Sequence, residues 1–470
     1  MGEHLLRIAI GSQIRIENPT QELKAYCRKE LVLDNPEYAK KVRMHKWVGH
    51  TPQKIHLYET DGKDLILPFG CLDHVQEYSD FKHDDIQIKM LAPKEVYYGC
   101  EIPLYDYQSE AVQEMFKAQY GILQAPAGSG KTQMGLQLAV LHNRKTLWIT
   151  HTADLLNQSK ERAEKYMDPS LIGTITEGKV NIGKGITFAT VQTLSKLYLL
   201  QYKNVWDTII VDECHRVASS PTSVSMFGKV LNTLAARHKY GLSATVHRSD
   251  GLIKSTFALL GDVKYTVPDE AVCGKIMKVG VKTVITHTPI SYEVLDTDGT
   301  IIYSSLISYL AKNEERNSLI ISHLADSGDH FNLILSDRVA HLRELMECLP
   351  GDLRNKAVMI DGSMTSKKAK EERRIALELM RQGKKNFLFA TYALCKEGLD
   401  IPRLDRLYMT TPVKDYAVVA QSVGRIARVF EGKQEPIVYD FVDSSFRYLV
   451  KAYKKRCTTY RKLGCNFKED

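Results

Sequence analysis

The sequence lacks any apolar run long enough to cross a bilayer, which excludes a membrane-spanning protein. It also lacks a Cys-x-x-Cys pair, because its nine cysteines are scattered along the chain. That spacing argues against a zinc knuckle and is typical of reduced thiols. The first twenty residues show an early acid, only a short apolar patch and no small-residue cleavage pattern. We therefore expect a cytoplasmic protein that is not secreted.

Length and composition are those of a multidomain globular protein. The 470 residues exceed what one hydrophobic core supports, and 44% of them are hydrophobic and 26% charged. Lys and Arg outnumber Asp and Glu only mildly, 64 to 56, but they gather in KKVRMHKW (40–47) and KKRCTTYRKLGCNFK (454–468). Basic residues beside aromatic ones suit phosphate contacts with base stacking. A solvated helix face and a flexible tail are the alternatives.

Short apolar runs alternate with longer amphipathic ones from Tyr105 onward, which predicts βαβ units and parallel sheets. The expected strands of the first half are 121–124, 146–150, 186–190, 208–213 and 240–245. A second series is expected at 331–336, 357–362, 386–391, 404–412 and 436–442. The carboxyl ends of such strands are where ligand chemistry concentrates. We therefore predict an α/β protein with two parallel sheets in tandem.

Changes in this rhythm predict the domain boundaries. Residues 1–96 show alternating patches with frequent Pro, Gly and Asp, and predict a small, mainly β (α+β) accessory domain. Residues 97–270 hold the first sheet and 301–446 the second, with a linker at 271–300. Residues 447–470 are expected to form a basic C-terminal segment.

The segment APAGSGKT (125–132) lies between an expected strand and an expected helix, which is the context of a P-loop. Backbone N–H groups of such a loop surround phosphate oxygens, and the glycines allow its tight turn. Lys131 would neutralise the β- and γ-phosphates, and Thr132 would bind Mg²⁺. Ala125 stands where the first glycine of the strict motif is usual. The predicted nucleotide contacts are Ala127, Gly128, Ser129, Gly130, Lys131 and Thr132.

A P-loop needs an acid on a neighbouring strand, and IIVDECH (209–215) supplies two. Asp212 at the strand end would hold Mg²⁺ through water, and Glu213 would be the base that orients water on the γ-phosphate. The alternative is a helix N-cap followed by a first-turn acid. The P-loop expected in the same sheet favours the catalytic interpretation.

Four segments in this order, APAGSGKT, VDECH, GLSAT and QSVGRIAR, resemble the motor motifs of superfamily-two helicases and translocases. The resemblance implies two tandem RecA-like domains, ATP and Mg²⁺ as cofactors, and nucleic acid as the partner. It also implies that Gln108 lies at the adenine side of the nucleotide. Ser243 and Thr245 would couple the state of ATP to the nucleic-acid groove. His215 would join them, with a purely structural histidine as the alternative.

The same resemblance implies which residues contact nucleic acid: Thr152, Thr190, Gln192, Arg248 and Thr391. Hydroxyls and backbone N–H groups contact phosphates and not bases, so we expect binding that is largely independent of base sequence. Salt should weaken it strongly.

The segment SATVHRSDGL (243–252) resembles the subgroup of the repair helicase XPB and of phage UvsW-like helicases that remodel branched DNA. XPB carries Arg-Glu-Asp after this motif, whereas Arg248, Ser249 and Asp250 stand here. No XPB-like role is therefore assigned to the middle residue. If a phage encodes the chain, the cytoplasm is that of the host.

The segment QSVGRIAR (421–428) lies on a helical pattern, so Arg425 and Arg428 are expected to project from the same face. By resemblance, Arg428 is the arginine finger, Arg425 contacts the γ-phosphate or the other sheet, and Gln421 faces the nucleotide. A surface helix with two salt-bridged arginines is the alternative.

A further segment of the second sheet, ATYALCKEGLDIP (390–402), resembles the motif that links ATP to nucleic acid. Thr391 at a strand end would bind a phosphate. Glu397, Gly398 and Asp400 would form the turn facing the cleft between the sheets, with Asp400 among the nucleotide contacts.

These observations together predict an ATP-dependent DNA helicase or translocase. We expect a monomeric motor on single-stranded, forked or junction DNA, with the accessory domain helping to select branched DNA. The resemblance implies movement 3′ to 5′. An RNA helicase is one alternative, and the motor subunit of a restriction or defence complex is another. A clamp that binds ATP without turnover is a third, but Lys131, Asp212, Glu213 and Arg428 together weigh against it.

Overall fold

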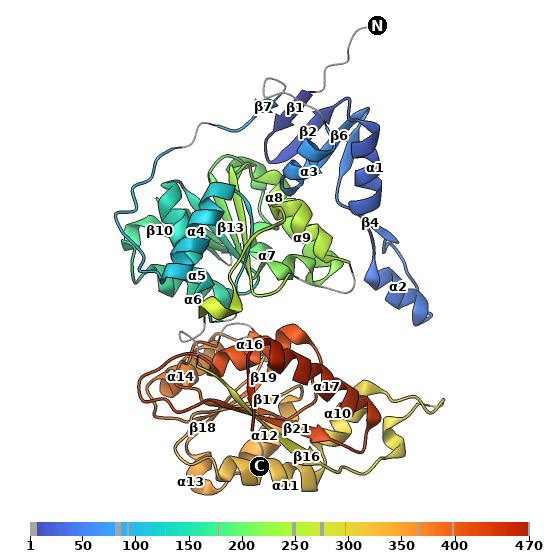
Figure 1. Cartoon of the computed structure of the whole chain (residues 1–470), viewed down its shortest axis with the longest axis vertical. Coiled ribbons are helices and arrows are strands. Elements are labelled where there is room, and N and C mark those ends of the chain that lie inside the picture. Colours follow the sequence, from blue (N-terminus) through green and yellow to red (C-terminus); the bar gives the residue numbers. More distant parts are fainter. Residues whose placement is uncertain are drawn as a thin grey trace. The chain divides into compact units, whose positions relative to one another are not determined.

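The structure is a computed structural model, shown in Figure 1. It describes residues 7–79, 86–91, 94–126, 128–176, 178–246, 251–272, 277–296, 298–364, 366–396 and 399–468. The chain forms two compact units, Met1–Ala271 and Val272–Asp470, and each contains one large, mostly parallel sheet. None of the described helices combines the length and the apolar character that a membrane crossing requires.

The large sheet of the first unit has eight strands in the order β11-β10-β12-β9-β13-β14-β8-β15. All its pairs are parallel except β10 with β11. The strands are β8 (Gly121–Gln124), β9 (Thr146–Thr150), β10 (Ile172–Thr176), β11 (Lys179–Asn181), β12 (Ile186–Thr190), β13 (Thr208–Asp212), β14 (His238–Ser243) and β15 (Val263–Thr266). The helices are α4 (Asp106–Ala118), α5 (Lys131–His142), α6 (Ala153–Ala163), α7 (Val191–Leu194), α8 (Pro221–Thr233) and α9 (Ile253–Leu260). The five strands expected here are confirmed, and β10, β11 and β15 extend the sheet.

The central strands of this sheet are continuous apolar runs because helices cover both faces. Every residue of β9, β12 and β13 is buried. Trp148 of β9 packs against Phe188 of β12, with ring centroids 5.9 Å apart. Gly135 of α5 lies so close that an added Cβ atom would come 2.7 Å from the Trp148 ring. The helix that follows the P-loop is therefore seated directly on the centre of the sheet.

The N-terminal residues form a smaller α+β subdomain with the strand order β5-β6-β2-β1-β7. Its elements are β1 (Arg7–Ile10), β2 (Gln13–Glu17), α1 (Gln21–Glu30), β5 (Glu59–Asp61), β6 (Asp64–Pro68), α3 (Leu72–Glu77) and β7 (Ile86–Ile88). Ile8, Ile14 and Ile16 alternate toward a core that Leu67 and Leu23 complete. This arrangement confirms the mainly β accessory domain expected from the sequence.

The subdomain is packed closely against α9 of the same unit. A Cβ atom on Gly70 would lie 2.2 Å from the backbone N of Gly261 and 2.4 Å from the carbonyl oxygen of Phe257, so only glycine fits there. Lys254 of α9 pairs with Glu30 at 2.6 Å. The accessory residues thus belong to the first unit and do not hang from it on a linker.

Between α1 and β5 the chain leaves the N-terminal sheet and forms what we call the arm, residues 32–57. The arm consists of β3 (Val32–Asp34), α2 (Pro36–Arg43), a loop and β4 (Lys54–His56). Strands β3 and β4 pair antiparallel, with Leu33 opposite Ile55. In Figure 1, α2 lies at the end of the arm, away from the N-terminal sheet.

The large sheet of the second unit has the order β18-β19-β17-β20-β21-β16-β22, and all its pairs are parallel. Its strands are β16 (Gly280–Thr286), β17 (Asn332–Ser336), β18 (Ala357–Ile360), β19 (Phe387–Thr391), β20 (Arg406–Met409), β21 (Ile437–Asp443) and β22 (Asn466–Phe467). Its helices are α10 (Tyr303–Ala311), α11 (Glu314–Ala325), α12 (Val339–Glu347), α13 (Gly351–Arg354), α14 (Lys367–Arg381), α15 (Tyr392–Lys396), α16 (Tyr416–Ile426) and α17 (Arg447–Lys462). The second series of expected strands is confirmed.

Residues 271–300 and 447–470 were expected to form a linker and a basic C-terminal segment. Both also contribute elements that pack in the second unit. Within 271–300, β16 pairs with β21 along seven residues of the sheet. Within 447–470, α17 buries Arg456, whose guanidinium donates two hydrogen bonds of 2.8 Å to the Asp440 carboxylate. Both segments are held by partners far away in the sequence, which local patterns do not reveal.

Candidate nucleotide and nucleic-acid site

The P-loop joins β8 to α5 at the carboxyl edge of the first sheet. Gly128 and Gly130 have φ angles of +84° and +83°, which is the left-handed region that favours glycine. The Lys131 ammonium donates to the carbonyl oxygens of Ala125 and Pro126, at 3.2 and 3.3 Å, and so lies over the loop. The start of α5 lies at this turn, and the N–H groups of a helix N-terminus are of the kind that bind phosphate.

Gln108 reaches the loop from α4. Its Nε2 donates to the Ser129 carbonyl oxygen at 2.7 Å, and its Oε1 accepts from the Tyr105 N–H at 2.9 Å. A Cβ atom on Gly130 would lie 2.3 Å from Gln108 Nε2. The Tyr107 hydroxyl, which sequence reasoning missed, donates to the same Ser129 carbonyl at 2.9 Å. Gln108 therefore contacts the loop itself.

Asp212 ends β13 and Glu213 follows it, and β14 separates β13 from β8. Asp212 is buried, and it accepts from the Ser159 hydroxyl at 3.3 Å and from the Glu213 N–H at 2.9 Å. Burial and then the neighbouring charge of Glu213 raise the pKa of the Asp212 carboxyl, while Lys131 lowers it. A cation next to this carboxylate would stabilise its charged form. Ser159, on α6, was not expected from the sequence.

The donor set fits Mg²⁺ bound together with a nucleotide. Among the described residues, no group of three or more His, Cys, Asp or Glu side chains could hold a metal ion. Mg²⁺ keeps several waters and takes one or two protein oxygens plus substrate phosphates. The Thr132 hydroxyl at the start of α5 and the Asp212 carboxylate at the end of β13 are oxygen donors of that kind.

The residues expected to couple ATP to nucleic acid lie in a continuous series of contacts. His215 Nδ1 is 3.2 Å from Glu213 Oε2 and 3.0 Å from the Ser243 hydroxyl oxygen at the end of β14. The Ser243 hydroxyl donates to the Thr245 carbonyl at 2.6 Å. His215 therefore contacts both the acid motif and the Ser-Ala-Thr motif, as the coupling interpretation requires.

The expected nucleic-acid contacts of the first unit lie at two adjacent strand ends. Thr152 follows β9 and caps α6 by accepting from the Leu155 N–H at 3.3 Å. Thr190 ends β12 and caps α7 by accepting from the Thr193 N–H, also at 3.3 Å. The strands pair in register there. Gln192 forms a 3.3 Å hydrogen bond with His151, a residue that the sequence analysis did not single out.

In the second unit, Arg425 is held against the segment after β19. Its Nε donates to the Cys395 carbonyl at 3.0 Å and its Nη1 to the Leu399 carbonyl at 3.2 Å. Arg428 forms an ion pair with Asp400. The expectation that both arginines project from one helical face is wrong, because α16 ends at Ile426. The chain turns there, and the Ala427 carbonyl accepts from the Met277 N–H at 2.7 Å.

The remaining expected residues of this unit lie nearby. Gln421 is buried on α16, and within the part of the chain that the structure describes its Oε1 has no hydrogen-bond partner. Thr391 ends β19 and accepts from the Leu394 N–H at 3.4 Å. The expected residues Ala127, Arg248, Ser249, Asp250, Glu397 and Gly398 lie outside the described residues.

Comparisons with known proteins match both units. A family described as type III restriction enzyme, res subunit, matches residues 101–248, and one described as helicase conserved C-terminal domain matches residues 305–430. The "Probable helicase D10" of Escherichia phage T5 is 25% identical over 459 residues, covering 95% of this chain and 92% of that protein. The "DNA 3'-5' translocase XPB2" of Sulfurisphaera tokodaii is 26% identical, covering 71% of this chain and 80% of the relative.

A third relative is the "ATP-dependent DNA helicase uvsW" of Enterobacteria phage T4, 23% identical over 92% of this chain and 89% of that protein. The two matched domains stand in the order of a tandem motor, the first with the P-loop and the acid pair, the second with QSVGRIAR. The chain belongs to the superfamily-two helicases and is an ATP-dependent helicase with relatives among the XPB and UvsW proteins.

Proposed function

We propose that this helicase is a DNA motor that remodels forks and junctions. The contact series from Glu213 through His215 to Ser243 and Thr245 carries the proposal, because it connects the acid beside the P-loop with a neighbouring strand end. A change at the γ-phosphate that moves Glu213 would alter the His215 contacts and with them the Ser-Ala-Thr segment. This series of contacts would let ATP hydrolysis change the conformation of the nucleic-acid surface.

The roles at the nucleotide follow from the chemistry of each group. Lys131 neutralises the β- and γ-phosphates, Thr132 and Asp212 hold Mg²⁺, and Glu213 orients the attacking water. The metal supplies charge neutralisation on the phosphates. Arg428 acts as the arginine finger by exchanging its Asp400 partner for the γ-phosphate, with Arg425 as a second γ-phosphate contact, Gln421 facing the nucleotide and Gln108 at its adenine side.

The proposed DNA contacts are mainly hydroxyls at helix N-termini. Thr152 and Thr190 are the N-cap residues of α6 and α7, and Thr391 ends β19 of the second unit. Hydroxyl and N–H groups bind phosphates, so these contacts would bind the backbone of DNA or of RNA irrespective of base sequence. The names of two relatives, a DNA translocase and a DNA helicase, favour DNA over RNA as the track.

The test is steady-state ATP hydrolysis by the full chain with no nucleic acid, single-stranded DNA, forked DNA, a four-way junction and RNA. The proposal expects the strongest stimulation with the branched DNAs. Glu213→Gln should abolish turnover while ATP still binds, and Glu161→Gln, at an exposed acid of α6, is the matched control. Stimulation by RNA alone would contradict a DNA motor.

Translocation along duplex DNA without strand separation is a second candidate. The match to a restriction-enzyme subunit family and the relative named a DNA translocase favour it. Displacement of a third strand from a triplex reports translocation, and release of a labelled strand from a fork reports unwinding. Triplex displacement without strand release or junction conversion would establish the second candidate in place of remodelling.

A further inference from the structure

The arm presents a basic and aromatic surface that the motor chemistry does not use. No side chain of α2 is buried. Lys40, Arg43 and Lys46 are exposed, as are Val42 and Met44 between them. Trp47 follows and is 83% exposed. Exposed apolar side chains that gather in one patch, as Val42, Met44 and Trp47 do here, mark interaction sites.

Trp47 differs from the other tryptophans of the chain. There are three, and Trp148 and Trp206 are only 0% and 2% exposed in the core of the first unit. The Trp47 ring lies against Gly49, where an added Cβ atom would come 2.8 Å from it. Gly49 has a φ angle of +52°, which glycine adopts without strain. The Trp47 ring therefore approaches Gly49 closely while most of the side chain remains exposed.

Side-chain hydrogen bonds connect α2 with the loop of the arm. The Asn35 side chain caps α2 and donates to the Pro52 carbonyl at 2.8 Å across the loop. Lys41 donates to the Thr51 hydroxyl at 2.6 Å. At its base, Leu33 packs in one apolar cluster with Ala218 and Leu252. Such contacts favour one conformation of the arm, and a preformed surface loses less conformational entropy on binding.

The base of the arm lies where the motor motifs end. Ala218 comes three residues after His215, and Leu252 follows the Ser-Ala-Thr segment. Both are buried against Leu33 in the same cluster. The base of the arm therefore packs against residues that adjoin the segments expected to connect ATP to nucleic acid.

The arm keeps a positive charge after its own ion pairs are subtracted. Lys41 pairs with Glu37 at 3.5 Å, and Lys54 pairs with Asp34 at 2.7 Å. Across the described ranges, no acidic side chain forms an ion pair with Lys40, Arg43 or Lys46. Three unpaired cations beside an aromatic ring match a strand of nucleic acid, with phosphates on the cations and a base on the ring.

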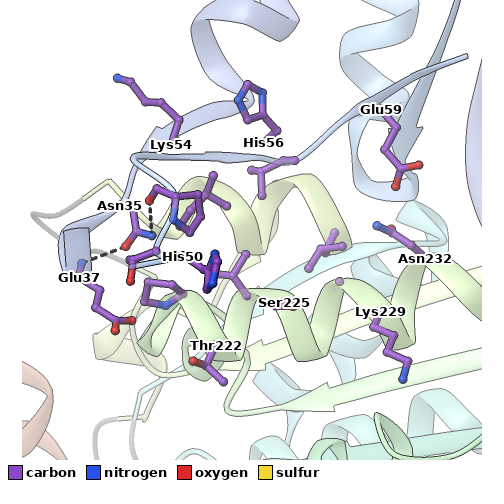
Figure 2. A pocket seen from close by; sticks show the side chains of 18 of the residues that line it. Asn35, Glu37, His50, Lys54, His56, Glu59, Thr222, Ser225, Lys229 and Asn232 are labelled. Atoms are coloured by element: carbon purple, nitrogen blue, oxygen red, sulfur yellow. Dashed lines mark hydrogen bonds between the residues drawn. The ribbon is translucent and has the colours of Figure 1, made fainter. Parts of the chain in front are cut away.

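A cavity of about 940 Å³ lies behind the arm, between it and α8. Figure 2 shows His50 and Lys54 on the arm side and Lys229 and Asn232 of α8 on the other. Basic and polar side chains of the arm and of α8 therefore line the cavity.

We propose that the arm binds the unpaired strand at a branch point of the nucleic acid. One base stacks on Trp47, the phosphates beside it lie on Lys40, Arg43 and Lys46, and the strand continues into the cavity next to α8. This inference rests on the proposed nucleic-acid motor and assigns the recognition of its branched substrate to a defined surface.

Trp47 itself provides the first readout. Trp47 is exposed whereas Trp148 and Trp206 are buried, so Trp47 is the tryptophan that a bound base can reach. Base stacking on Trp47 should quench its fluorescence when a forked DNA is added. In Trp47→Phe the remaining emission should not change with DNA. Trp47→Ala should weaken binding of a labelled fork about 5- to 150-fold, the range expected for one stacked base. Tyr292→Ala, which removes an aromatic side chain that is 91% exposed in the second unit, is the matched control and should bind normally.

The salt dependence of binding tests the cations. Lys40→Ala with Arg43→Ala should make the slope of log K against log salt less steep by about 1.4, because each phosphate contact with a single strand contributes about 0.7. The control is Lys356→Ala with Lys384→Ala, which also removes two positive charges. Both lysines are exposed and precede β18 and β19, at the sheet edge opposite the strand ends that carry the chemistry.

The outcomes separate this inference from the proposed function. Stimulation of ATP hydrolysis by branched DNA, together with normal fork binding by Trp47→Ala, would overturn the arm proposal and leave the motor intact. No stimulation by any nucleic acid would overturn both.

Discussion

Lys239 gives the sharpest prediction about how the N-terminal subdomain is attached. Its side chain is fully buried on β14 and donates to the carbonyl oxygens of Ser12 at 3.0 Å and Leu231 at 2.7 Å. The ammonium lies 4.9 Å from the centre of the Phe69 ring. Among the described residues, none forms an ion pair with it. Burial lowers the pKa of Lys239 from 10.5 to about 7.

The sign of the effect on stability follows from the protons bound by each state. Between pH 7 and 10.5 the unfolded chain holds the proton on Lys239 and the folded chain releases it. Unfolding then takes up a proton, so the free energy of unfolding rises with pH, by at most about 1.4 kcal/mol per pH unit. Below pH 7 the folded state carries the buried charge, and the full penalty applies. From pH 7 to pH 9 the gain is about 2 kcal/mol.

Lys239→Met removes this titration and keeps the length of the side chain. All three tryptophans lie in the first unit, so urea unfolding followed by tryptophan fluorescence reports on that unit. The stability of the unsubstituted protein minus that of Lys239→Met should rise by about 2 kcal/mol between pH 7 and pH 9. Lys117→Met, at an exposed lysine, is the control and should show no such rise. Parallel pH curves for the protein and Lys239→Met would refute the reasoning.

Three further substitutions test other contacts. Gly70→Ala forces a Cβ atom against the backbone of Phe257 and should lower the stability of the first unit by about 1–3 kcal/mol, measured by tryptophan fluorescence in urea. Asp440→Ala leaves the buried Arg456 guanidinium unpaired and should lower the stability of the second unit by about 3–5 kcal/mol, measured by circular dichroism. Ser243→Ala removes a partner of His215 and should reduce DNA-stimulated ATP hydrolysis more than unstimulated hydrolysis. Equal loss of both rates would contradict the coupling role.

Local pattern was sufficient for most of the fold. The strands of both large sheets are apolar runs bounded by turn residues, and buried parallel strands must look like this. The P-loop and the acid pair are equally local, since each depends on a few consecutive residues beside a strand end. For the same reason the sequence placed Thr152 and Thr190 at strand ends, where each now caps a helix.

Contacts between distant residues could not be predicted. Gln108 reaches Ser129 across the helix packing, and Lys239 depends on Ser12, more than two hundred residues away. Strand β16 pairs with β21, which is also far away in the sequence. Patterns of neighbouring residues therefore do not predict its place in the sheet. The end of α16 before Arg428 depends on Met277, again from a remote segment.

The central claim is that ATP hydrolysis moves this protein along DNA and remodels a branch. The most direct measurement is the ATP-dependent conversion of a labelled four-way junction into its duplex products by the full chain and by Glu213→Gln. The account predicts conversion with ATP, none with a non-hydrolysable analogue, and none with the variant. Conversion that persists in Glu213→Gln, or hydrolysis stimulated by the junction without any conversion, would contradict it.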